Sequence, residues 1–474
     1  MAQVLQQDGI HLLIEEVRSR FGPKAAITDR AEVDPWLTDW RGKFHGESAA
    51  ILSPASTEEV ATIVKLAAER RVPLVPQGGN TGMVGGATPP SDGSALILSL
   101  RRMNRVRSID TGLAVAEAGV ILASLHERAS ETGQRFPLTL GARGSCTIGG
   151  LVATNAGGTQ VLKFGTMRSL VLGLEAVLPD GSIHDGLSGL KKDNRGYNLD
   201  QLFAGSEGTL GVVTAAALRL VPAIGSRTVA WVGMSEAQGA LELLQFMQSK
   251  TDRIEGFEIV PADCLELVLK HVPGTRSPLE GRHAWNVLIE ATADSGQADP
   301  ADRVQALLGE ALQRGLIEDA ALASSEAQAE AFWRIRDSIS EAERADGPTL
   351  AHDISVPIAD MPRFMTVTAA EVEQAFPGTQ ASGFGHLGDG NVHFHVRGEA
   401  VRGRESEISH MVYDLVTLAG GSISAEHGIG QMKLEELERL GPPAKLHALR
   451  AIKQALDPLG LMNPGKLIRQ AQRA

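Results

Sequence analysis

Residues 77–86 read QGGNTGMVGG and directly follow the apolar run VPLVP at residues 72–76. Five of the nine residues from position 78 to position 86 are glycine. Glycines let backbone N–H groups turn inward together and form a nest for an anion. The apolar run predicts a strand that leads into this loop. The stretch therefore indicates an anion-binding turn at the end of a strand.

A second glycine-rich block, residues 141–158, reads GARGSCTIGGLVATNAGG and holds six glycines in eighteen residues. Because glycine has no side chain, such a block allows the backbone to approach a flat ring closely. Either block alone could be a long surface turn. Since both blocks follow predicted strands in the same part of the chain, we favour a cofactor that carries phosphate.

Strand and helix patterns surround both loops and continue along the chain. Ser56 and Glu59 fit a capping box, which predicts a helix through about Arg70. Apolar runs at residues 94–100 and 171–178, and a run ending at Val221, predict further strands. Beyond about residue 226, strand-like pieces alternate with long helical patterns, at residues 300–315 and 326–345 for example. This predicts a second α+β domain, followed by a mostly helical tail.

The composition excludes several classes of protein. Of the 474 residues, 43% are hydrophobic and 22% are charged, which argues against disorder. A net charge of −12 is a poor match to a nucleic-acid backbone. The two cysteines exclude a disulfide scaffold and an iron–sulfur cluster held by cysteines. No signal-peptide pattern and no apolar stretch of about 18 residues occurs, so we expect no membrane span and a cytoplasmic enzyme.

Histidines are concentrated in one part of the second domain. Five of the 13 histidines fall within the 42 residues from His386 to His427. In the segment VHFHV, strand alternation places His393 and His395 on one face and the apolar residues on the other. An Asp-Gly turn before this strand allows His386 to fold back beside His393. His410 lies on a predicted helix, and we assign it a structural role.

The pair Glu426-His427 follows in the glycine-rich segment GGSISAEHGIG. Glu426 could join His386 and His393 in a set of three ligands. Such a set leaves one coordination position open, which is typical of a catalytic Zn²⁺ site, and Mn²⁺ or Fe²⁺ also accepts these ligands. The alternative is a group of hydrogen-bonded histidines without a metal. Spacing alone does not separate a metallohydrolase from a metal-assisted oxidoreductase.

Seven motifs in this order give the chain a family resemblance. They are PQGGNTG at 76–82, GSCTIGG at 144–150, ATNAGG at 153–158, GSEGTLG at 205–211, GHLGDGNVH at 385–393, SAEHG at 424–428 and NPGK at 463–466. With these motifs the chain resembles the FAD-linked D-2-hydroxyacid dehydrogenases of the vanillyl-alcohol-oxidase superfamily, which include D-2-hydroxyglutarate and D-lactate dehydrogenases. The resemblance extends from about Ala49 to Lys466.

The resemblance implies an α+β fold with a PCMH-type FAD-binding domain of two subdomains. A ferredoxin-like substrate (cap) domain and a helical C-terminal segment would complete it. The expected division is an N-terminal helical segment at 1–48, the FAD-binding domain at 49–224, the substrate domain with the metal site at 225–422, and a C-terminal segment at 423–474 that packs back on the FAD domain.

The resemblance also implies how FAD is held. Relatives with a covalent flavin often carry a His in the first loop, and this chain has Asn80 there, so non-covalent FAD is expected. The first loop would hold the pyrophosphate, the second block would line the flavin, and residues 207–213 would close the site. The expected cofactor-binding residues are Pro76, Gly78, Gly79, Asn80, Thr81, Gly82, Met83, Pro137, Gly141, Ser145, Ile148, Gly149, Asn155, Gly158, Glu207, Gly208, Val213 and Asn463.

By the same resemblance, the metal ligands fall on His386, His393 and Glu426, with Zn²⁺ or Mn²⁺ as the ion. The catalytic base falls on His427, which would take the hydroxyl proton while the α-hydrogen leaves as hydride to flavin N5. The substrate would be D-2-hydroxyglutarate, D-lactate or a related D-2-hydroxyacid, and the product a 2-oxoacid. A metallohydrolase or lyase without flavin chemistry is the alternative.

Substrate contacts would fall on Arg336, Ser340 and His395, although Arg336 could instead form an ion pair, for example with Glu343. Two positions depart from the pattern of hydroxyglutarate enzymes. Ala351 stands where a Lys is common, and His395 stands where an Asn is common. These departures weaken the assignment of a five-carbon diacid. The electron acceptor would be an electron-transfer flavoprotein, a quinone or a cytochrome, and a homodimer is one assembly open to the chain.

Overall fold

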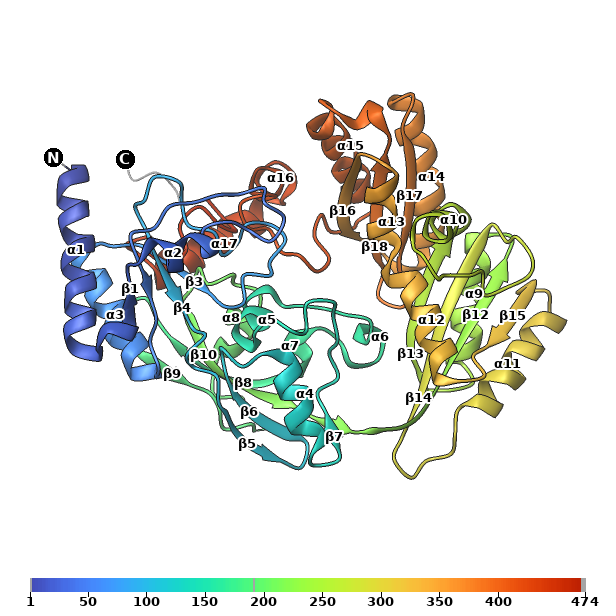
Figure 1. Cartoon of the computed structure of the whole chain (residues 1–474), viewed down its shortest axis with the longest axis horizontal. Helices are drawn as coiled ribbons and strands as arrows, with labels where there is room; N and C mark the ends of the chain where they lie inside the picture. The colour runs from blue at the N-terminus through green and yellow to red at the C-terminus, as the bar shows by residue number, and fades with distance from the viewer. Residues whose placement is uncertain (1, 191, 470–474) are drawn as a thin grey trace. The chain divides into compact units, whose positions relative to one another are not determined.

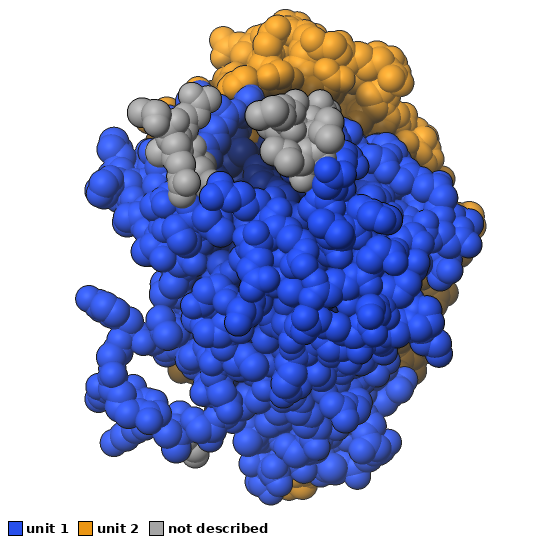
Figure 2. Space-filling model, turned by 90° about the vertical axis from the view of Figure 1, so that its left-hand side faces the viewer, with its two compact units in different colours: residues 1–158, 165–222, 426–474 blue, residues 159–164, 223–425 orange. Residues whose placement is uncertain are grey.

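The computed structural model describes residues 2–190 and 192–469. The chain forms two compact units, shown as ribbons in Figure 1 and coloured blue and orange in Figure 2. Unit 1 comprises residues 1–158, 165–222 and 426–474, and unit 2 comprises residues 159–164 and 223–425. Each unit is therefore assembled from segments that are distant in the sequence.

Unit 1 contains a small sheet in the order β1(Ala26–Ile27), β2(Ile51–Leu52), β4(Leu96–Ser99) and β3(Leu74–Gln77). Strands β2, β4 and β3 are parallel. Helix α3(Thr57–Arg70) begins as predicted, because the Ser56 side chain accepts a hydrogen bond from the backbone N–H of Glu59. The N-terminal helix α1(Ala2–Phe21) packs against α3.

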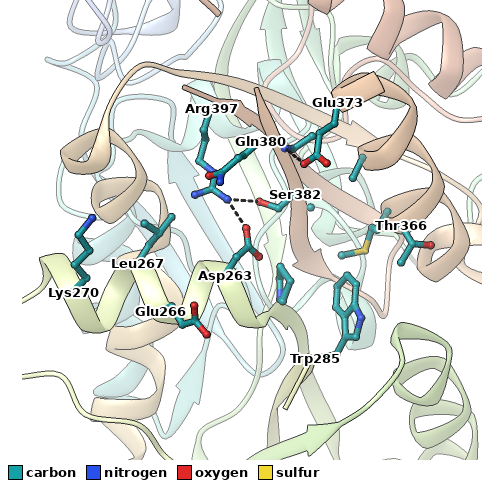
Figure 3. A pocket seen from close by; sticks show the side chains of 15 residues that line it. Asp263, Glu266, Leu267, Lys270, Trp285, Thr366, Glu373, Gln380, Ser382 and Arg397 are labelled. Carbon is teal, nitrogen blue, oxygen red and sulfur yellow. Dashed lines mark hydrogen bonds and ion pairs between the residues drawn. The ribbon is translucent and has the colours of Figure 1, made fainter. Parts of the chain in front are cut away.

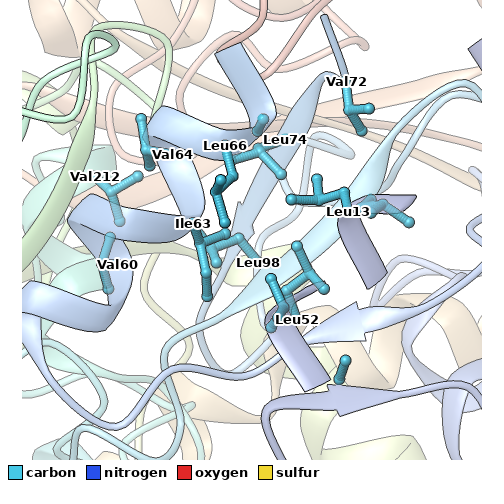
Figure 4. Packing of buried hydrophobic residues seen from close by; sticks show 14 of the residues in the cluster. Leu13, Leu52, Val60, Ile63, Val64, Leu66, Val72, Leu74, Leu98 and Val212 are labelled. Atoms are coloured by element: carbon cyan, nitrogen blue, oxygen red, sulfur yellow. The ribbon is translucent and has the colours of Figure 1, made fainter. Parts of the chain in front are cut away.

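The buried core of unit 1 lies between this sheet and its helices. Leu13 of α1, Ile63 of α3 and Leu98 of β4 belong to one cluster, and Figure 4 shows their side chains close together. Val60, Ile63, Val64 and Ala67 of α3 are all buried, as their helical spacing requires. The N-terminal residues are therefore part of the same core as the first glycine loop's strand.

A second sheet of unit 1 has five antiparallel strands. Their order is β5(Val106–Asp110), β6(Leu113–Glu117), β10(Val212–Arg219), β8(Val171–Val177) and β9(Ile183–Asp185). A short pair joins β11(Val221–Pro222) to β7(Gln134–Arg135). The other elements of unit 1 are η1(Pro23–Ala25), α2(Arg30–Val33), η2(Asp34–Trp36), α4(Leu122–Ser130), α5(Ile148–Thr154), α7(Met167–Leu170), α8(Leu199–Phe203), α16(Leu434–Leu440) and α17(Pro443–Leu456).

Unit 2 is built on a seven-stranded sheet in which every pair of neighbours is antiparallel. Its order is β15(Asp319–Leu322), β12(Ile224–Met234), β14(Trp285–Asp294), β13(Ile254–Pro261), β17(Gln380–His386), β18(Asn391–Arg397) and β16(Thr349–Ser355). Its helices are α6(Val161–Phe164), α9(Ala237–Gln248), α10(Ala262–His271), α11(Ala301–Gln313), α12(Glu326–Asp337), α13(Ile339–Asp346), η3(Ile358–Asp360), α14(Met361–Ala375), η4(Glu399–Val401) and α15(Glu405–Leu418).

The long helix expected at residues 326–345 is two helices. Helix α12 ends at Asp337 and α13 begins at Ile339, with Ser338 between them at φ −86° and ψ −2°. Helical periodicity continues through this joint, because both helices bury an apolar side against the core formed with α10. The break is therefore not visible in the sequence pattern.

Mixed helices and sheets confirm the predicted α+β fold class. Within residues 2–190 and 192–469, no helix combines the length and the apolar character needed to cross a bilayer.

Replacing Ile63 with Ala should reveal how much unit 1 depends on this core. Ile63 is fully buried, so Ile63→Ala should lower the free energy of unfolding by about 2–5 kcal/mol. Leu12→Ala is the control, because Leu12 on α1 is 58% exposed and its loss should change the value by less than about 0.5 kcal/mol. Denaturant titration followed by circular dichroism measures both. Equal losses would contradict the assignment of this core.

Candidate active site

The first glycine loop leaves the end of β3 and is held by the N-terminal part of the chain. The Gln77 side chain donates to the carbonyl oxygens of Trp36 and Ala87, at 3.0 Å in each case. Asn80, which has φ 53°, donates from Nδ2 to the Thr38 carbonyl oxygen at 2.9 Å. Residues 36–38 thus fix the loop from outside, a role that the sequence gave no signal for.

The two glycine blocks lie in direct contact. A Cβ atom on Gly78 would stand 2.2 Å from Thr147 Oγ1, and one on Gly79 would stand 1.9 Å from the Ser145 carbonyl oxygen. Only glycine avoids these overlaps, so the residue type is required for the blocks to pack. Thr147 Oγ1 and Gln77 Oε1 are buried and have no hydrogen-bond partner in the protein. A ligand with polar atoms would satisfy them.

Glu207 joins the first loop to the C-terminal part of unit 1. Its carboxylate accepts hydrogen bonds from the backbone N–H groups of Ile429 and Gly430, both at 2.7 Å. Asn463 Nδ2 donates to the carbonyl oxygens of Gly86 at 2.9 Å and Glu207 at 2.6 Å, while Asn463 Oδ1 is buried without a partner. Burial raises the pKa of Glu207. Burial also lowers the pKa of Lys466 to about 8, although the charge of Glu207 acts in the opposite direction.

The other expected cofactor residues take varied positions. Pro76 packs 3.1 Å from the position that a Cβ on Gly208 would take, and a Cβ on Gly158 would stand 2.3 Å from the Thr139 carbonyl oxygen. Gly82 and Gly141 face open space. Asn155, with φ 49°, ends α5 and accepts from the Arg168 backbone N–H. Of the remaining ones, Thr81, Met83 and Pro137 lie outside helices and strands, Ile148 and Gly149 are in the first turn of α5, and Val213 is on β10.

The three expected metal ligands come together. His386, His393 and Glu426 each offer one ligand atom, and these atoms all lie within 4.8 Å of one another. His386 ends β17 and His393 is on β18, and their ring centroids are 5.5 Å apart at an interplanar angle of 80°. Two imidazoles and a carboxylate are the donor set of a catalytic zinc site.

Sequence reasoning missed a carboxylate behind His386. Glu258 on β13 pairs with His386 in register, and its Oε1 lies 2.6 Å from His386 Nδ1. Arg336 Nε donates to the other oxygen of Glu258 at 2.7 Å. Burial raises the pKa of Glu258, but the charges of Arg336 and His386 outweigh it and bring the pKa to about 2. The available signal was the presence of two acidic residues, Glu255 and Glu258, inside the otherwise apolar strand IEGFEIVP.

Glu258 contacts His386 through Nδ1, and Arg336 lies 3.5 Å from Nε2 of the same ring. A carboxylate that holds the second nitrogen of a metal-binding His fixes its tautomer and raises its basicity. Burial, followed by the charges of Arg336 and His386, holds the pKa of His393 well below its usual value. His393 is therefore neutral, which is the form that binds a metal.

His427 directly follows Glu426, and both side chains are half-buried. The next residue, Gly428, has φ 81°, and a Cβ there would stand 2.7 Å from Glu207 Oε1. The hydrogen bonds of Glu207 to the following two residues therefore fix the turn that carries Glu426 and His427.

Two of the expected substrate residues, Arg336 and His395, each contact a buried carboxylate. Arg336 on α12 forms its ion pair with Glu258 and not with Glu343. Glu343 instead contacts His395 Nδ1, and both side chains are buried. Ser340 is half-buried on α13. His410 on α15 lies 3.3 Å from Ser406 Oγ through its Nδ1.

Comparison with known proteins decides the family. Residues 48–186 match the description "FAD binding domain", and residues 225–467 match "FAD linked oxidases, C-terminal domain". The chain belongs to the FAD-linked oxidase family. It is therefore an FAD-dependent oxidoreductase, which confirms the resemblance found in the sequence.

Curated proteins of similar sequence carry the names of dehydrogenases or transhydrogenases that act on D-2-hydroxyacids. The chain is 40% identical over 453 residues to D-2-hydroxyglutarate dehydrogenase, mitochondrial, of Bos taurus, covering 95% of this chain and 82% of the relative. It is 35% identical to a putative mitochondrial D-lactate dehydrogenase of Schizosaccharomyces pombe, covering 93% and 86%. It is also 34% identical to a D-2-hydroxyglutarate–pyruvate transhydrogenase of Saccharomyces cerevisiae, covering 92% and 90%.

Solved structures of two other proteins share the fold. p-Cresol methylhydroxylase with substrate bound has a TM-score of 0.73 at 14% identity, covering 98% of each chain. Alkyldihydroxyacetonephosphate synthase has a TM-score of 0.73 at 17% identity, covering 95% of this chain and 84% of the other. At these identities the likeness shows the fold alone, and this fold agrees with the predicted p-cresol methylhydroxylase (PCMH) type.

The expected cytoplasmic location is wrong by this comparison, because the relatives from Bos taurus, Arabidopsis thaliana and Schizosaccharomyces pombe are named mitochondrial. The expectation rested on composition and on the absence of a long apolar run. Neither property distinguishes one aqueous compartment from another.

Glu258→Gln should weaken metal binding. The amide keeps the shape but loses the charge that supports His386, so zinc affinity should fall about 10–100-fold. Glu290→Gln is the matched control, because Glu290 is a similarly buried carboxylate that pairs with Arg227 at 3.0 Å on the neighbouring strand. Competition with a zinc chelator measures both variants. An unchanged affinity in Glu258→Gln would remove Glu258 from the metal site.

Proposed function

We propose that this chain oxidises a D-2-hydroxyacid to the corresponding 2-oxoacid, with FAD and a divalent metal ion, Zn²⁺ or Mn²⁺, as cofactors. The observation that carries the proposal is the convergence of His386, His393 and Glu426 in a chain of the FAD-linked oxidase family. The names of the relatives support the substrate class. Hydroxyacids offer a hydroxyl and a carboxylate oxygen, which suit a metal site with open positions.

The residues of unit 1 fit non-covalent FAD. The buried and unpartnered atoms Gln77 Oε1, Thr147 Oγ1 and Asn463 Oδ1 come from the first loop, the second block and the NPGK motif, all of which the resemblance assigns to the cofactor site. The loop at residues 76–83 would bind the pyrophosphate, because its backbone can present several N–H groups to an anion. Asn80 stands at the position where a His would carry a covalent flavin.

Bound FAD supplies the oxidising power, as the acceptor of a hydride at flavin N5, and the bound metal supplies a Lewis acid. The protein supplies position and charge. His427 would take the proton of the substrate hydroxyl, because an imidazole can accept a proton near neutral pH. Arg336, kept in place by Glu258, would orient the substrate carboxylate with its guanidinium group.

The electrons then pass to an acceptor, for which an electron-transfer flavoprotein, a quinone and a cytochrome are the candidates. A homodimer stays a prediction. A metallohydrolase or lyase would use the same histidines and glutamate, but it would leave the two glycine blocks and their unpartnered polar atoms without a purpose.

Anaerobic mixing tests the proposed function directly. The FAD-loaded chain should lose its visible flavin absorbance when a D-2-hydroxyacid is added and should keep it with the L-enantiomer. A panel of D-2-hydroxyacids that leaves the absorbance unchanged would contradict the proposal.

His427→Ala should lower kcat by about 10²–10⁴-fold, which is the usual effect of losing a general base. His410→Ala is the control, since His410 lies outside the metal group, and its kcat should stay near the wild-type value. Steady-state rates with a dye acceptor measure both. A near-wild-type rate for His427→Ala would assign the base to another residue.

Removal of the metal should separate its role from that of the flavin. Chelator-treated protein should retain the flavin spectrum and lose turnover, and added Zn²⁺ or Mn²⁺ should restore it. Absorbance and rate are measured on the same sample. Full turnover of metal-free protein would exclude the metal from the reaction.

A further inference from the structure

The face of the unit 2 sheet that carries His393 is organised in rows of neighbouring strands. One row holds Asp353, His393 and Phe384, and the next row along β18 holds Ala351, His395 and Ser382. Successive side chains on one face of a strand are two residues, or about 7 Å, apart. A small molecule anchored at His393 therefore extends to the second row within a few bonds.

In the second row, the small residue Ala351 on β16 lies beside His395 on β18, and the His395 imidazole contacts a carboxylate. Ala351 is half-buried and contributes only a methyl group. The His395 imidazole contacts Glu343, whose side chain is fully buried. The two positions where this chain departs from hydroxyglutarate enzymes are thus direct partners across the strands.

A third row holds Thr349, Arg397 and Gln380, and the Arg397 guanidinium is paired with a carboxylate. Arg397 is 8% exposed and forms an ion pair with Asp263, and its Nε lies 3.7 Å from Glu343 Oε1. Figure 3 shows Arg397 turned toward Asp263 and Ser382, which line a cavity of about 540 Å³.

The three strands that carry these rows add one arginine to the described residues of this face. Strands β16, β17 and β18 contain one arginine, Arg397, and no lysine. Toward the start of β18, the side chains are acidic or neutral: Asp353 accepts from Asn391 Nδ2 at 3.1 Å, and Asp389 lies in the adjoining turn. Arg336 is balanced by Glu258 and can orient one carboxylate.

We propose that Ala351, together with the His395–Glu343 pair, restricts the substrate to D-2-hydroxyacids with an uncharged side chain. A second carboxylate at this row would lose its hydration without gaining a cation, which is unfavourable. An uncharged side chain loses no such hydration. This inference rests on the proposed function, because it starts from a hydroxyacid anchored at the metal ligands.

Two compounds of equal size test the proposal on the full chain loaded with FAD and zinc. D-2-hydroxyglutarate carries a distal carboxylate, and D-2-hydroxyglutaramate carries the neutral amide in its place. We expect kcat/KM to be at least about tenfold higher for the amide. Calorimetric titration with 2-oxoglutarate and 2-oxohexanoate should show the same preference in Kd. Equal or better use of the diacid, in rate or in binding, would overturn the proposal.

Ala351→Lys tests the position itself. The added ammonium should raise kcat/KM for D-2-hydroxyglutarate at least about tenfold and should not raise it for the amide. Ala351→Met is the matched control, because it adds a side chain of similar length without a charge. A similar gain in both variants would show that charge is not the determinant and would overturn the proposal.

The outcomes separate this inference from the proposed function. If neither compound nor D-lactate reduces the flavin, the proposed function fails, whereas a wild-type preference for the diacid contradicts only the substrate class. Flavin absorbance and the thermal midpoint report whether the variants fold. If Ala351→Lys does not fold, the wild-type comparison of rates and Kd values still decides.

Discussion

The buried carboxylate of Glu207 is the constraint on which the arrangement of unit 1 depends. It accepts hydrogen bonds from the backbone N–H groups of Ile429 and Gly430, which lie 222 and 223 positions further along the chain. A buried carboxylate without such donors would be costly, so the pairing fixes the distant segment firmly. Because Glu426 and His427 directly precede these residues, the same interaction fixes the turn that carries the proposed metal ligand and the proposed base. Asn463 extends this connection to the carbonyl oxygens of both Gly86 and Glu207.

In unit 2, carboxylates contact arginine and histidine side chains that are largely buried. Glu258 pairs with Arg336 and contacts His386. Glu343 contacts His395, and Asp263 pairs with Arg397. Arg336 and Arg397 each lie beside a carboxylate, which is how a protein tolerates ionised groups away from water. In the proposed reaction Arg336 would orient one carboxylate of the substrate, while Arg397 stays paired with Asp263.

Much of the local structure could be predicted from the sequence. The capping box at Ser56 and Glu59 gave the correct start of α3, and the VHFHV alternation gave the strand β18 with its apolar residues buried. His386, His393 and Glu426 were predicted as metal ligands from residue types and family motifs, and in the structure one potential ligand atom of each lies within 4.8 Å of the others. The division of the long 326–345 helix was not predicted, since its apolar spacing continues across Ser338.

Residue types and short spacings determined the strands, the capped helices and the glycine loops, because these depend on interactions between residues close in the chain. The tertiary structure decided which carboxylate supports which histidine and which backbone N–H groups close the cofactor loops. Glu258 and His386 are 128 residues apart, and no local pattern encodes such a pairing. Only the register of β13 against β17 brings their side chains together, and that register is set by the packing of the whole sheet.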